Sequence, residues 1–240
     1  MNKNSEMARF ATMMIGNPYW YGTYTQTATP KLYADKKAQY PSAYTQNDYT
    51  EQYGKRVCDC IGLVKGCAWC EDFSSEPIYN RDQDVGTNGL YKLATQKGRM
   101  NTFPKHPGQL VFKGDLQDLY HVGVYIGTNM IVEAKGHAYG VVVSKLTSNW
   151  TYWCQCPWFE DDTGHLAVKA PFNMSYGDSG KEVQLLQMAL AMRGYDLGRW
   201  GMDGEFYKAT DKALREFQKD HGLDVDGIAG TQTWQEFING

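Results

Sequence analysis

The sequence predicts an α+β domain followed by a small domain made only of helices. Three observations support this prediction. Apolar residues recur at helical spacing after Cys60, at Ile61, Leu63, Val64 and Ala68. From Gly108 onward, apolar and polar residues alternate with a period of two, which is typical of strands. From Asp178 the helical spacing returns. A helix followed by a run of antiparallel strands is an α+β arrangement, with the helix packed on the sheet.

A segment without periodicity separates the two predicted domains. Residues 161–177 favour neither a helix nor a strand, and we interpret them as a linker. The first domain is therefore expected to span 1–160 and the second 178–240. A chain of 240 residues can bury a separate core in each of them.

The N-terminal part contains two predicted helices and an aromatic turn. Apolar spacing predicts a helix over 5–15, which a glycine and a proline end. The turn over 16–22 is rich in aromatic residues. The tyrosine-rich insertion, which we define as residues 23–55, is polar, and a bare loop of that length is uncommon in a compact domain. We therefore expect a short helix over 32–39 that packs over the functional site.

The middle of the chain supplies the main helix and the sheet. The helix that begins at Cys60 should end near Asp72, and a shorter helix is expected near 88–96. The expected strands are 109–112, 121–126, 130–134, 140–146 and 151–156, of which the second and third form a hairpin.

Three helices are expected in the second domain. Ser179 and Glu182 have the spacing of a capping box, and the first helix should continue until Gly194. The second and third helices are expected over 207–220 and 231–239. Each is preceded by an Asp-Gly pair with a threonine six positions after the glycine. These turns lack the further carboxylates of a calcium loop, so calcium is not expected.

Charge and hydropathy exclude two classes of partner. The net charge is −3 and no basic stripe is present, so nucleic acid is not an expected partner. No apolar stretch approaches the length of a membrane span, so no membrane insertion is expected. Glu6 and Arg9 interrupt the short apolar run at the N-terminus, and no small-residue cleavage site follows it. We therefore expect synthesis in the cytoplasm without a signal peptide.

The six cysteines occur as three close pairs: Cys58 and Cys60, Cys67 and Cys70, Cys154 and Cys156. A reducing cytoplasm would keep them as thiols. The middle pair has the spacing of a zinc pair, but it falls among apolar residues of the predicted helix and the knuckle turns are missing. We expect buried thiols there, and we expect neither a metal nor a cofactor.

Cys60 is the candidate nucleophile. It falls at the first turn of a predicted helix, where unpaired N–H groups and the helix dipole favour a thiolate. The alternative is a small apolar core residue, which most free cysteines are. A nucleophilic cysteine also needs a base. His121 begins a strand of the same domain, whereas His106 falls in a loop and His165 and His221 fall outside the domain.

Four motifs in register resemble the NlpC-type papain-like cysteine peptidases of bacterial cell walls. They are, in order, Gly16-x-Pro18-Tyr19-x-x-Gly22, Asp59-Cys60-x-Gly62-Leu63, Pro107-Gly108-x-Leu110-Val111-Phe112 and His121-Val122-Gly123-Val124-Tyr125-Ile126-Gly127. Residues 178–240 resemble the common three-helix peptidoglycan-binding domain, through Leu186-Gln187, Gly194-Tyr195, Asp203-Gly204, Phe217-Gln218, Asp226-Gly227, Gly230 and Thr233-Trp234. Together the two resemblances cover nearly the whole chain.

The resemblance implies a set of catalytic residues. Cys60 would be the nucleophile, His121 the base, and Tyr19 a tyrosine near the oxyanion. Two positions depart from the family's pattern. Ile61 stands where a serine usually follows the nucleophile, and Glu133 stands where the third residue is most often a histidine.

The resemblance also implies the substrate. Bacterial peptidoglycan would be the partner, with Asp59, Trp20, Tyr21 and His137 as substrate-binding residues. The activity would be that of a stem-peptide endopeptidase, as in the endolysin of a bacteriophage or prophage, acting on the wall after release. One alternative is an N-acetylmuramoyl-L-alanine amidase with the same catalytic residues. Another is a non-catalytic wall-binding protein that kept the fold.

The register of the predicted hairpin favours Glu133 over His137 as the partner of His121. If the loop has three residues, Ile126 pairs with Met130, and the apolar residues of both strands share one face. Glu133 is then a diagonal neighbour of His121, with β-carbons roughly 7 Å apart. It could accept a hydrogen bond from Nδ1 of the ring. His137 falls beyond the strand, in a turn.

Overall fold

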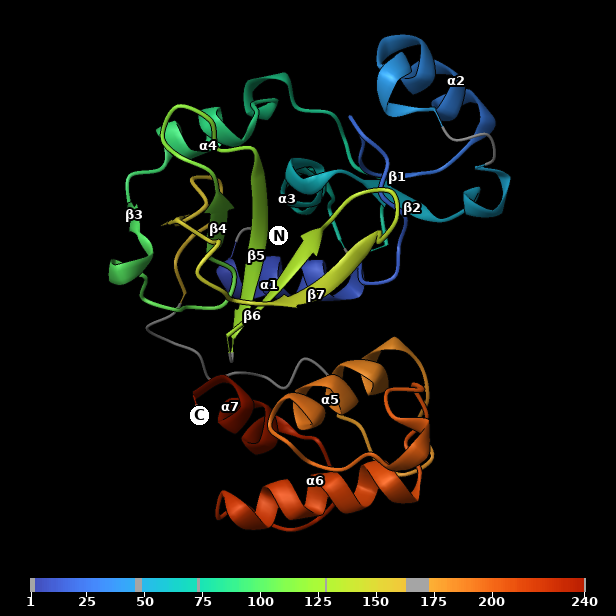
Figure 1. Ribbon diagram of the computed structural model, residues 1–240, viewed down its shortest axis with the longest axis vertical. Helices are drawn as coiled ribbons and strands as arrows, with labels where there is room; N and C mark the ends of the chain where they lie inside the picture. Colours follow the sequence, from blue (N-terminus) through green and yellow to red (C-terminus); the bar gives the residue numbers. More distant parts are fainter. Residues whose placement is uncertain (1–2, 46–48, 73, 128, 163–172, 240) are drawn as a thin grey trace. The chain divides into compact units, whose positions relative to one another are not determined.

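The computed structural model describes residues 3–45, 49–72, 74–127, 129–162 and 173–239. The chain divides into two compact units, Met1–His165 and Leu166–Gly240 (Figure 1). Most of the predicted linker, residues 163–172, lies outside the described residues, as does His165. Within the described ranges, no helix has the length and apolarity needed to cross a membrane.

The first unit contains a six-stranded antiparallel sheet with the strand order β3-β8-β4-β5-β6-β7. The strands are β3 (Lys97–Arg99), β4 (Leu110–Lys113), β5 (His121–Gly127), β6 (Met130–Ala134), β7 (Val141–Lys145) and β8 (Tyr152–Cys154). Four of the five predicted strands differ from these bounds by one or two residues at an end, and 130–134 agrees at both ends. Only β3 is an addition to the predicted sheet. This mixed helix-and-sheet architecture confirms the predicted α+β class.

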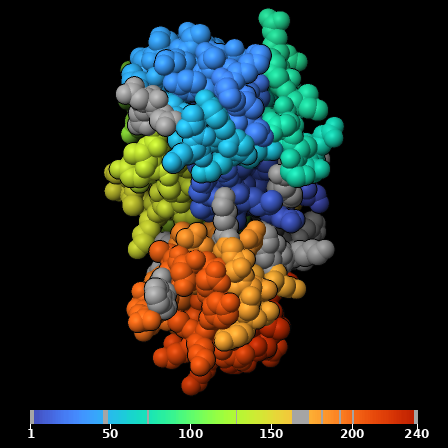
Figure 2. All heavy atoms as spheres, turned by 90° about the vertical axis from the view of Figure 1, so that its right-hand side faces the viewer, coloured from blue at the N-terminus to red at the C-terminus, as the bar shows by residue number. Residues whose placement is uncertain are grey.

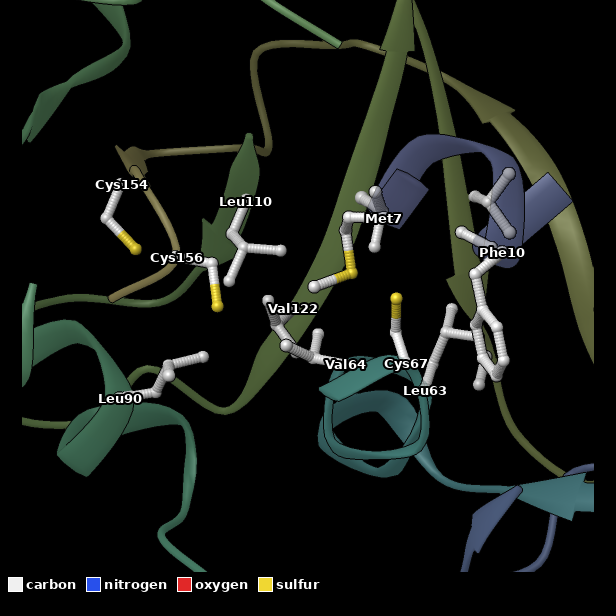
Figure 3. Packing of buried hydrophobic residues seen from close by; sticks show 14 of the residues in the cluster. Met7, Phe10, Leu63, Val64, Cys67, Leu90, Leu110, Val122, Cys154 and Cys156 are labelled. Atoms are coloured by element: carbon white, nitrogen blue, oxygen red, sulfur yellow. The ribbon is translucent and has the colours of Figure 1, made fainter. Parts of the chain in front are cut away.

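The main core of this unit lies between the sheet and two helices, α1 (Asn4–Met13) and α3 (Cys60–Trp69). Figure 3 shows Leu63, Val64 and Cys67 of α3 and Met7 and Phe10 of α1 against Leu110 and Val122 of the sheet. Cys154 and Cys156 belong to the same core, and all six cysteines of the chain are free thiols. Burying this apolar surface holds α3 on the sheet.

Helix α3 is shorter than predicted. It ends at Trp69 instead of Asp72, because Cys70 takes an extended conformation. The strand β1 (Tyr24–Thr27) pairs with β2 (Arg56–Cys58) and packs along α3. A β-carbon at Gly62 would lie 1.8 Å from the Thr23 carbonyl oxygen, so only glycine permits this close approach. This two-stranded sheet was not predicted, because its strands have only four and three residues.

The tyrosine-rich insertion forms a small core of its own. Its helix, α2 (Pro30–Gln39), begins after Thr29, whose hydroxyl accepts the N–H of Leu32. The predicted helix 32–39 therefore exists and starts two residues earlier. Trp20, Tyr44, Tyr49 and Val57 are buried together beside it. In Figure 2 the insertion, coloured blue to cyan, occupies the upper part of the face shown. The remaining helix of the unit is α4 (Thr87–Leu93).

The second unit contains the three predicted helices, α5 (Lys181–Met192), α6 (Lys208–Asp220) and α7 (Thr231–Asn239). Phe217 of α6 stacks on Phe237 of α7 with ring centroids 4.1 Å apart. The capping box at Ser179 was a wrong prediction. Gly180 is the N-cap, with no side-chain cap, because Ser179 pairs with Glu205 in a β-bridge.

Each Asp-Gly turn of the second unit is fixed by a buried glutamine. Gln187 Nε2 donates to Asp203 Oδ1 at 2.8 Å, and Gln187 Oε1 accepts the N–H of Gly204 at 2.8 Å. Gln218 makes the same two bonds with Asp226 and Gly227, at 2.8 and 3.0 Å. The internal repeat seen in the sequence is therefore also a repeat of hydrogen bonds.

Candidate active site

Asp59 fixes the start of α3. It is the N-cap residue, and its Oδ1 accepts the N–H of Gly62 at 2.7 Å. Its Oδ2 accepts the N–H of Gly22 at 2.8 Å, which ties the aromatic turn to the helix. Asp59 is 7% exposed, and both carboxylate oxygens hydrogen-bond the backbone. Asp59 was predicted to bind substrate, and in the structure it positions the start of α3 and the aromatic turn.

Cys60 is the first residue of α3 and lies beside β5. Burial raises the pKa of its thiol, and the charge of Asp59 adds to this effect. The backbone N–H groups of Val122 and Ile61 hydrogen-bond the sulfur and act against the rise, but the pKa still reaches about 12. Burial therefore acts against the thiolate expected at a helix start, and its effect on the pKa is larger than that of the backbone N–H groups.

His121 and Glu133 form a direct hydrogen bond. Glu133 Oε2 lies 2.6 Å from His121 Nε2, and the Glu133 side chain is 1% exposed. Burial raises the pKa of Glu133, but hydrogen bonds from His121, Ser144 and Lys113 outweigh it and lower the pKa to about 2. An ionised carboxylate only accepts hydrogen bonds, so Nε2 carries the proton and Nδ1 of the neutral ring is the basic nitrogen. The predicted hydrogen bond from Nδ1 is therefore corrected to one from Nε2.

Two further residues complete this cluster. Lys113 Nζ lies 3.0 Å from the same oxygen, Glu133 Oε2, and 4.2 Å from the ring centroid of Trp150. The Trp150 ring lies 5.7 Å from that of His121. Neither Lys113 nor Trp150 was predicted from the sequence to belong to the site. Lys113 is paired with His121 across β4 and β5, so the alternation along β4 was the signal that could have found it.

The hairpin of β5 and β6 has the predicted register away from its turn. Val124 pairs with Val132 and Tyr125 with Ile131, as expected for the three-residue loop. The predicted pairing of Ile126 with Met130 is wrong, because a bulge near the turn pairs Gly127 with Met130. The bulge leaves the register unchanged at the end of the hairpin that holds His121 and Glu133.

Tyr19 and His137 lie together on the other side of the site. Their ring centroids are 5.1 Å apart, edge to face. Burial raises the pKa of the Tyr19 hydroxyl, and the charges of Asp59 and Cys60 add to this, so Tyr19 is in the electrostatic field of the nucleophile. His137 also contacts the rings of Tyr44 and Tyr49, at 6.0 and 5.9 Å. His137 therefore joins the tyrosine-rich insertion to Tyr19.

Trp20 and Tyr21 differ sharply in exposure. Trp20 is fully buried, and its indole N–H donates to Gln52 at 2.5 Å, so it is corrected from a substrate-binding residue to a core residue of the insertion. Tyr21 is 45% exposed and packs edge to face on Tyr40 at 5.0 Å. Of the predicted aromatic substrate contacts, Tyr21 is therefore the one with an open ring surface.

Further histidines and cysteines have other surroundings. His106 is in a loop, and His221 of the second unit contacts Glu236 at 2.8 Å. Burial raises the pKa of Cys67, which lies in the core next to Cys156. Among the described residues, no group of three or more histidine, cysteine, aspartate or glutamate side chains could hold a metal ion.

Two protein families match the chain. Residues 16–158 match the NlpC/P60 family, and residues 179–236 match a peptidoglycan binding domain family. The first match includes the motifs around Tyr19, Cys60 and His121, and the second includes both Asp-Gly turns.

Curated relatives resemble the chain over short segments. It is 40% identical over 57 residues to the N-acetylmuramoyl-L-alanine amidase CwlL of Bacillus licheniformis, which is 24% of this chain and 16% of the amidase. It is 44% identical over 62 residues to a spore cortex-lytic enzyme of Bacillus cereus, which is 26% of this chain and 23% of that enzyme. The chain thus spans less than a quarter of the length of these two relatives.

Solved structures cover more of the chain at lower identity. The peptidoglycan hydrolase RipB of Mycobacterium tuberculosis is 20% identical, with 63% of each chain covered and a TM-score of 0.40. The NlpC/p60 domain of the peptidoglycan hydrolase SagA is 16% identical, with 64% of this chain and 98% of that domain covered and a TM-score of 0.38.

Proposed function

Because the chain belongs to the NlpC/P60 family, we propose that it is a peptidoglycan hydrolase that cuts a stem-peptide amide bond with Cys60 as the nucleophile. The observation that carries this proposal is the 2.6 Å hydrogen bond between His121 Nε2 and Glu133, which leaves Nδ1 as the base. The sulfur of Cys60 accepts the N–H of Val122, the residue next to His121, so both side chains serve one reaction centre.

The first half of the reaction forms a thioester. The Cys60 thiol gives its proton to His121 Nδ1 as the sulfur attacks the substrate carbonyl carbon. Glu133 stays ionised and stabilises the imidazolium that results. The carbonyl oxygen becomes an oxyanion, which the N–H of Cys60 at the helix start can bind, with the Tyr19 hydroxyl as a second donor. Breakdown of this intermediate releases an amine, which takes the proton from His121.

The second half restores the thiol. A water molecule gives a proton to His121 and attacks the thioester carbonyl carbon, and the C–S bond breaks. The products are a carboxylic acid on the substrate and the Cys60 thiol, which recovers its proton from His121. A thiol with a pKa of about 12 makes proton transfer to His121 part of the attack, because little thiolate exists beforehand.

We propose an endopeptidase, and an N-acetylmuramoyl-L-alanine amidase is the second candidate. The amidase reading is favoured by the curated relative of that name, which matches 24% of this chain. Both activities use the same residues and differ in the bond that the groove places over Cys60. We further propose that the second unit holds the chain on the wall, as in an endolysin released from the cytoplasm.

Mass spectrometry of digested wall sacculi tests this proposal. An endopeptidase produces a new amine within the stem peptide, whereas an amidase frees the amine of the first alanine and leaves bare glycan. Cys60→Ala is the control, because it removes only the sulfur. Absence of any new terminus with the unmodified protein, under conditions where it binds sacculi, would favour the non-catalytic wall-binding alternative.

A further inference from the structure

Trp150 belongs to a small core on the face of the sheet that carries His121. It is 3% exposed, and Tyr125 and Ile131 are members of the same core. Side chains alternate along a strand, so Tyr125, Gly123 and His121 share one face of β5. A β-carbon at Gly123 would lie 2.9 Å from the end of the Trp150 ring. Glycine at this position therefore leaves the room that the indole occupies.

The Trp150 ring contacts two members of the candidate active site. Its centroid lies 5.7 Å from that of His121, with the ring planes tilted by 36°, and 4.2 Å from Lys113 Nζ. The lysine contact is short, since Lys65 Nζ lies 5.7 Å from the ring centroid of Trp69. A cation gains more from an indole face when it is partly removed from water, and the Lys113 side chain is only 20% exposed.

One carboxylate oxygen binds both of these neighbours. Glu133 Oε2 lies 2.6 Å from His121 Nε2 and 3.0 Å from Lys113 Nζ. A lysine side chain is flexible and its ammonium has three donors, so the carboxylate alone does not fix its position. If the ammonium shifted along the carboxylate, it would compete with the imidazole for this oxygen. The aromatic face restricts Lys113 to the position in which both bonds are made.

We propose that Trp150 is a positioning residue, which holds the Lys113 ammonium and the His121 ring in the arrangement in which both bond Glu133. This inference rests on the proposed function, because it takes His121 as the base. Since Trp150 is 3% exposed, it is not expected to touch the substrate. Its replacement should therefore slow the chemical step and leave substrate binding unchanged.

Trp150→Leu tests this inference in the full chain, with soluble muropeptides as the substrate. The variant lacks the aromatic face, so kcat should fall about tenfold at an unchanged KM, the size expected for a cation over a partly buried indole. The acid limit of kcat/KM should move to higher pH, because a displaced Lys113 lowers the pKa of Glu133 less. Trp150→Phe keeps an aromatic face and should keep most of the activity.

Trp153→Leu is the matched control. Trp153 belongs to the same small core and is 7% exposed, and its ring lies 6.0 Å from that of Phe103. Its indole N–H donates to Thr102 at 3.1 Å. The substitution removes the same side chain from the same core, so it should also lower the Tm. Measured below the Tm of both variants, it should leave kcat and the acid limit unchanged.

A double-mutant cycle identifies the route of the effect. If Trp150 acts by placing the ammonium, Trp150→Leu should move the acid limit in the unmodified chain and should add no further shift in Lys113→Met.

Nitrogen-15 NMR of the His121 ring gives a readout that needs no turnover. The unmodified chain should show the Nε2–H tautomer, with the signals assigned by their loss in His121→Gln. Trp150→Leu should give a mixture of tautomers, because the bond to Glu133 is less well fixed. Trp153→Leu should keep the single tautomer.

Three outcomes would overturn the inference while leaving the proposed function intact. They are equal kcat values for Trp150→Leu and Trp153→Leu, a full acid shift by Trp150→Leu in the Lys113→Met background, and an unchanged tautomer in Trp150→Leu. The proposed function fails in a different way. In that case the unmodified chain releases no new termini from sacculi, and the tautomer of His121 still changes in Trp150→Leu.

Discussion

Glu133 holds His121 by Nε2, at 2.6 Å, and not by Nδ1. Because Nε2 is bonded to Glu133, Nδ1 is the ring nitrogen that remains for proton exchange with another group. Nε2 faces the Glu133 carboxylate, which is 1% exposed, and Nδ1 is the nitrogen that the proposed mechanism assigns to the proton of the thiol. The orientation of the ring is thus set by strands β5 and β6, which are held in register by the core below them.

Replacing the nucleophile should separate catalysis from binding. Cys60→Ala should abolish lysis of sacculi, because no other group can form the thioester, and it should leave sedimentation with sacculi unchanged. Cys58→Ala is the control, since Cys58 is fully buried in the core and is two residues away. It should keep most of the activity. An essential Cys58 beside a dispensable Cys60 would show that the wrong thiol was assigned.

Replacing Glu133 should slow the chemical step. Glu133→Gln keeps the shape but lacks the charge that stabilises the imidazolium, so kcat should fall about 100-fold or more while KM changes little. His137→Phe should keep most activity, because its ring contacts with Tyr19, Tyr44 and Tyr49 are retained. The assignment fails if the His137 variant is inactive and the Glu133 variant is fully active.

Lys113 should set the acid side of the pH profile. It lies 3.0 Å from Glu133 and helps to lower the pKa of that carboxyl. In Lys113→Met the pKa of Glu133 rises, so this carboxylate is protonated, and activity should be lost, at a higher pH as the solution is acidified. Lys113→Arg should restore the profile of the unmodified chain. Measurements of kcat/KM from pH 4 to pH 8 check this shift, and superimposable profiles would contradict it.

Glu133 should also make folding stability depend on pH. Its pKa falls from 4.5 to about 2 on folding, so its contribution is complete above the unfolded value and is lost as the pH falls toward the folded value. The difference in unfolding free energy between the unmodified chain and Glu133→Gln should therefore shrink between pH 6 and pH 3. Urea unfolding at several pH values measures it. A constant difference would mean that the carboxylate contributes no linked stability.

The second unit should bind the wall by itself. A fragment of residues 173–240 contains the three helices, the bridge between Met174 and Ala229 and both glutamine-fixed turns. Acidic residues outnumber basic ones in it, so attraction to an anionic wall is not the expected driving force. Sedimentation with sacculi should persist in about 1 M salt, where charge interactions are screened. Release of the fragment at moderate salt would point to ionic binding.

Much of this fold could be predicted from periodicity. The five strands from 109 to 156, the helices α1 and α3 and the three helices of the second unit follow from apolar spacing. Helix α2 has no buried residue and was expected from the length of the insertion. The short strands β1 and β3 were missed, since three or four polar residues show no clear alternation. The bulge near Gly127 and the early end of α3 at Trp69 depend on backbone angles that neighbouring segments impose.

The site was less predictable than the fold. Cys60, His121 and Glu133 could be named because each sits at a defined point of a helix or strand. The raised pKa of Cys60 could not be predicted, because the loss of solvent around the thiol depends on packing by β5 and by the aromatic turn. Trp20 was mistaken for a surface residue because the sequence does not show that the tyrosine-rich insertion has a core.

The raised pKa of Cys60 also affects how fast this thiol reacts with small oxidants and alkylating agents. Hydrogen peroxide and alkylating agents react with thiolates, and a thiol with a pKa of about 12 presents almost none at neutral pH. A raised pKa therefore makes the resting thiol slow to react with oxidants, and in the proposed mechanism it reacts when a carbonyl group and His121 act on it together. Slow labelling by iodoacetamide would be compatible with rapid wall lysis.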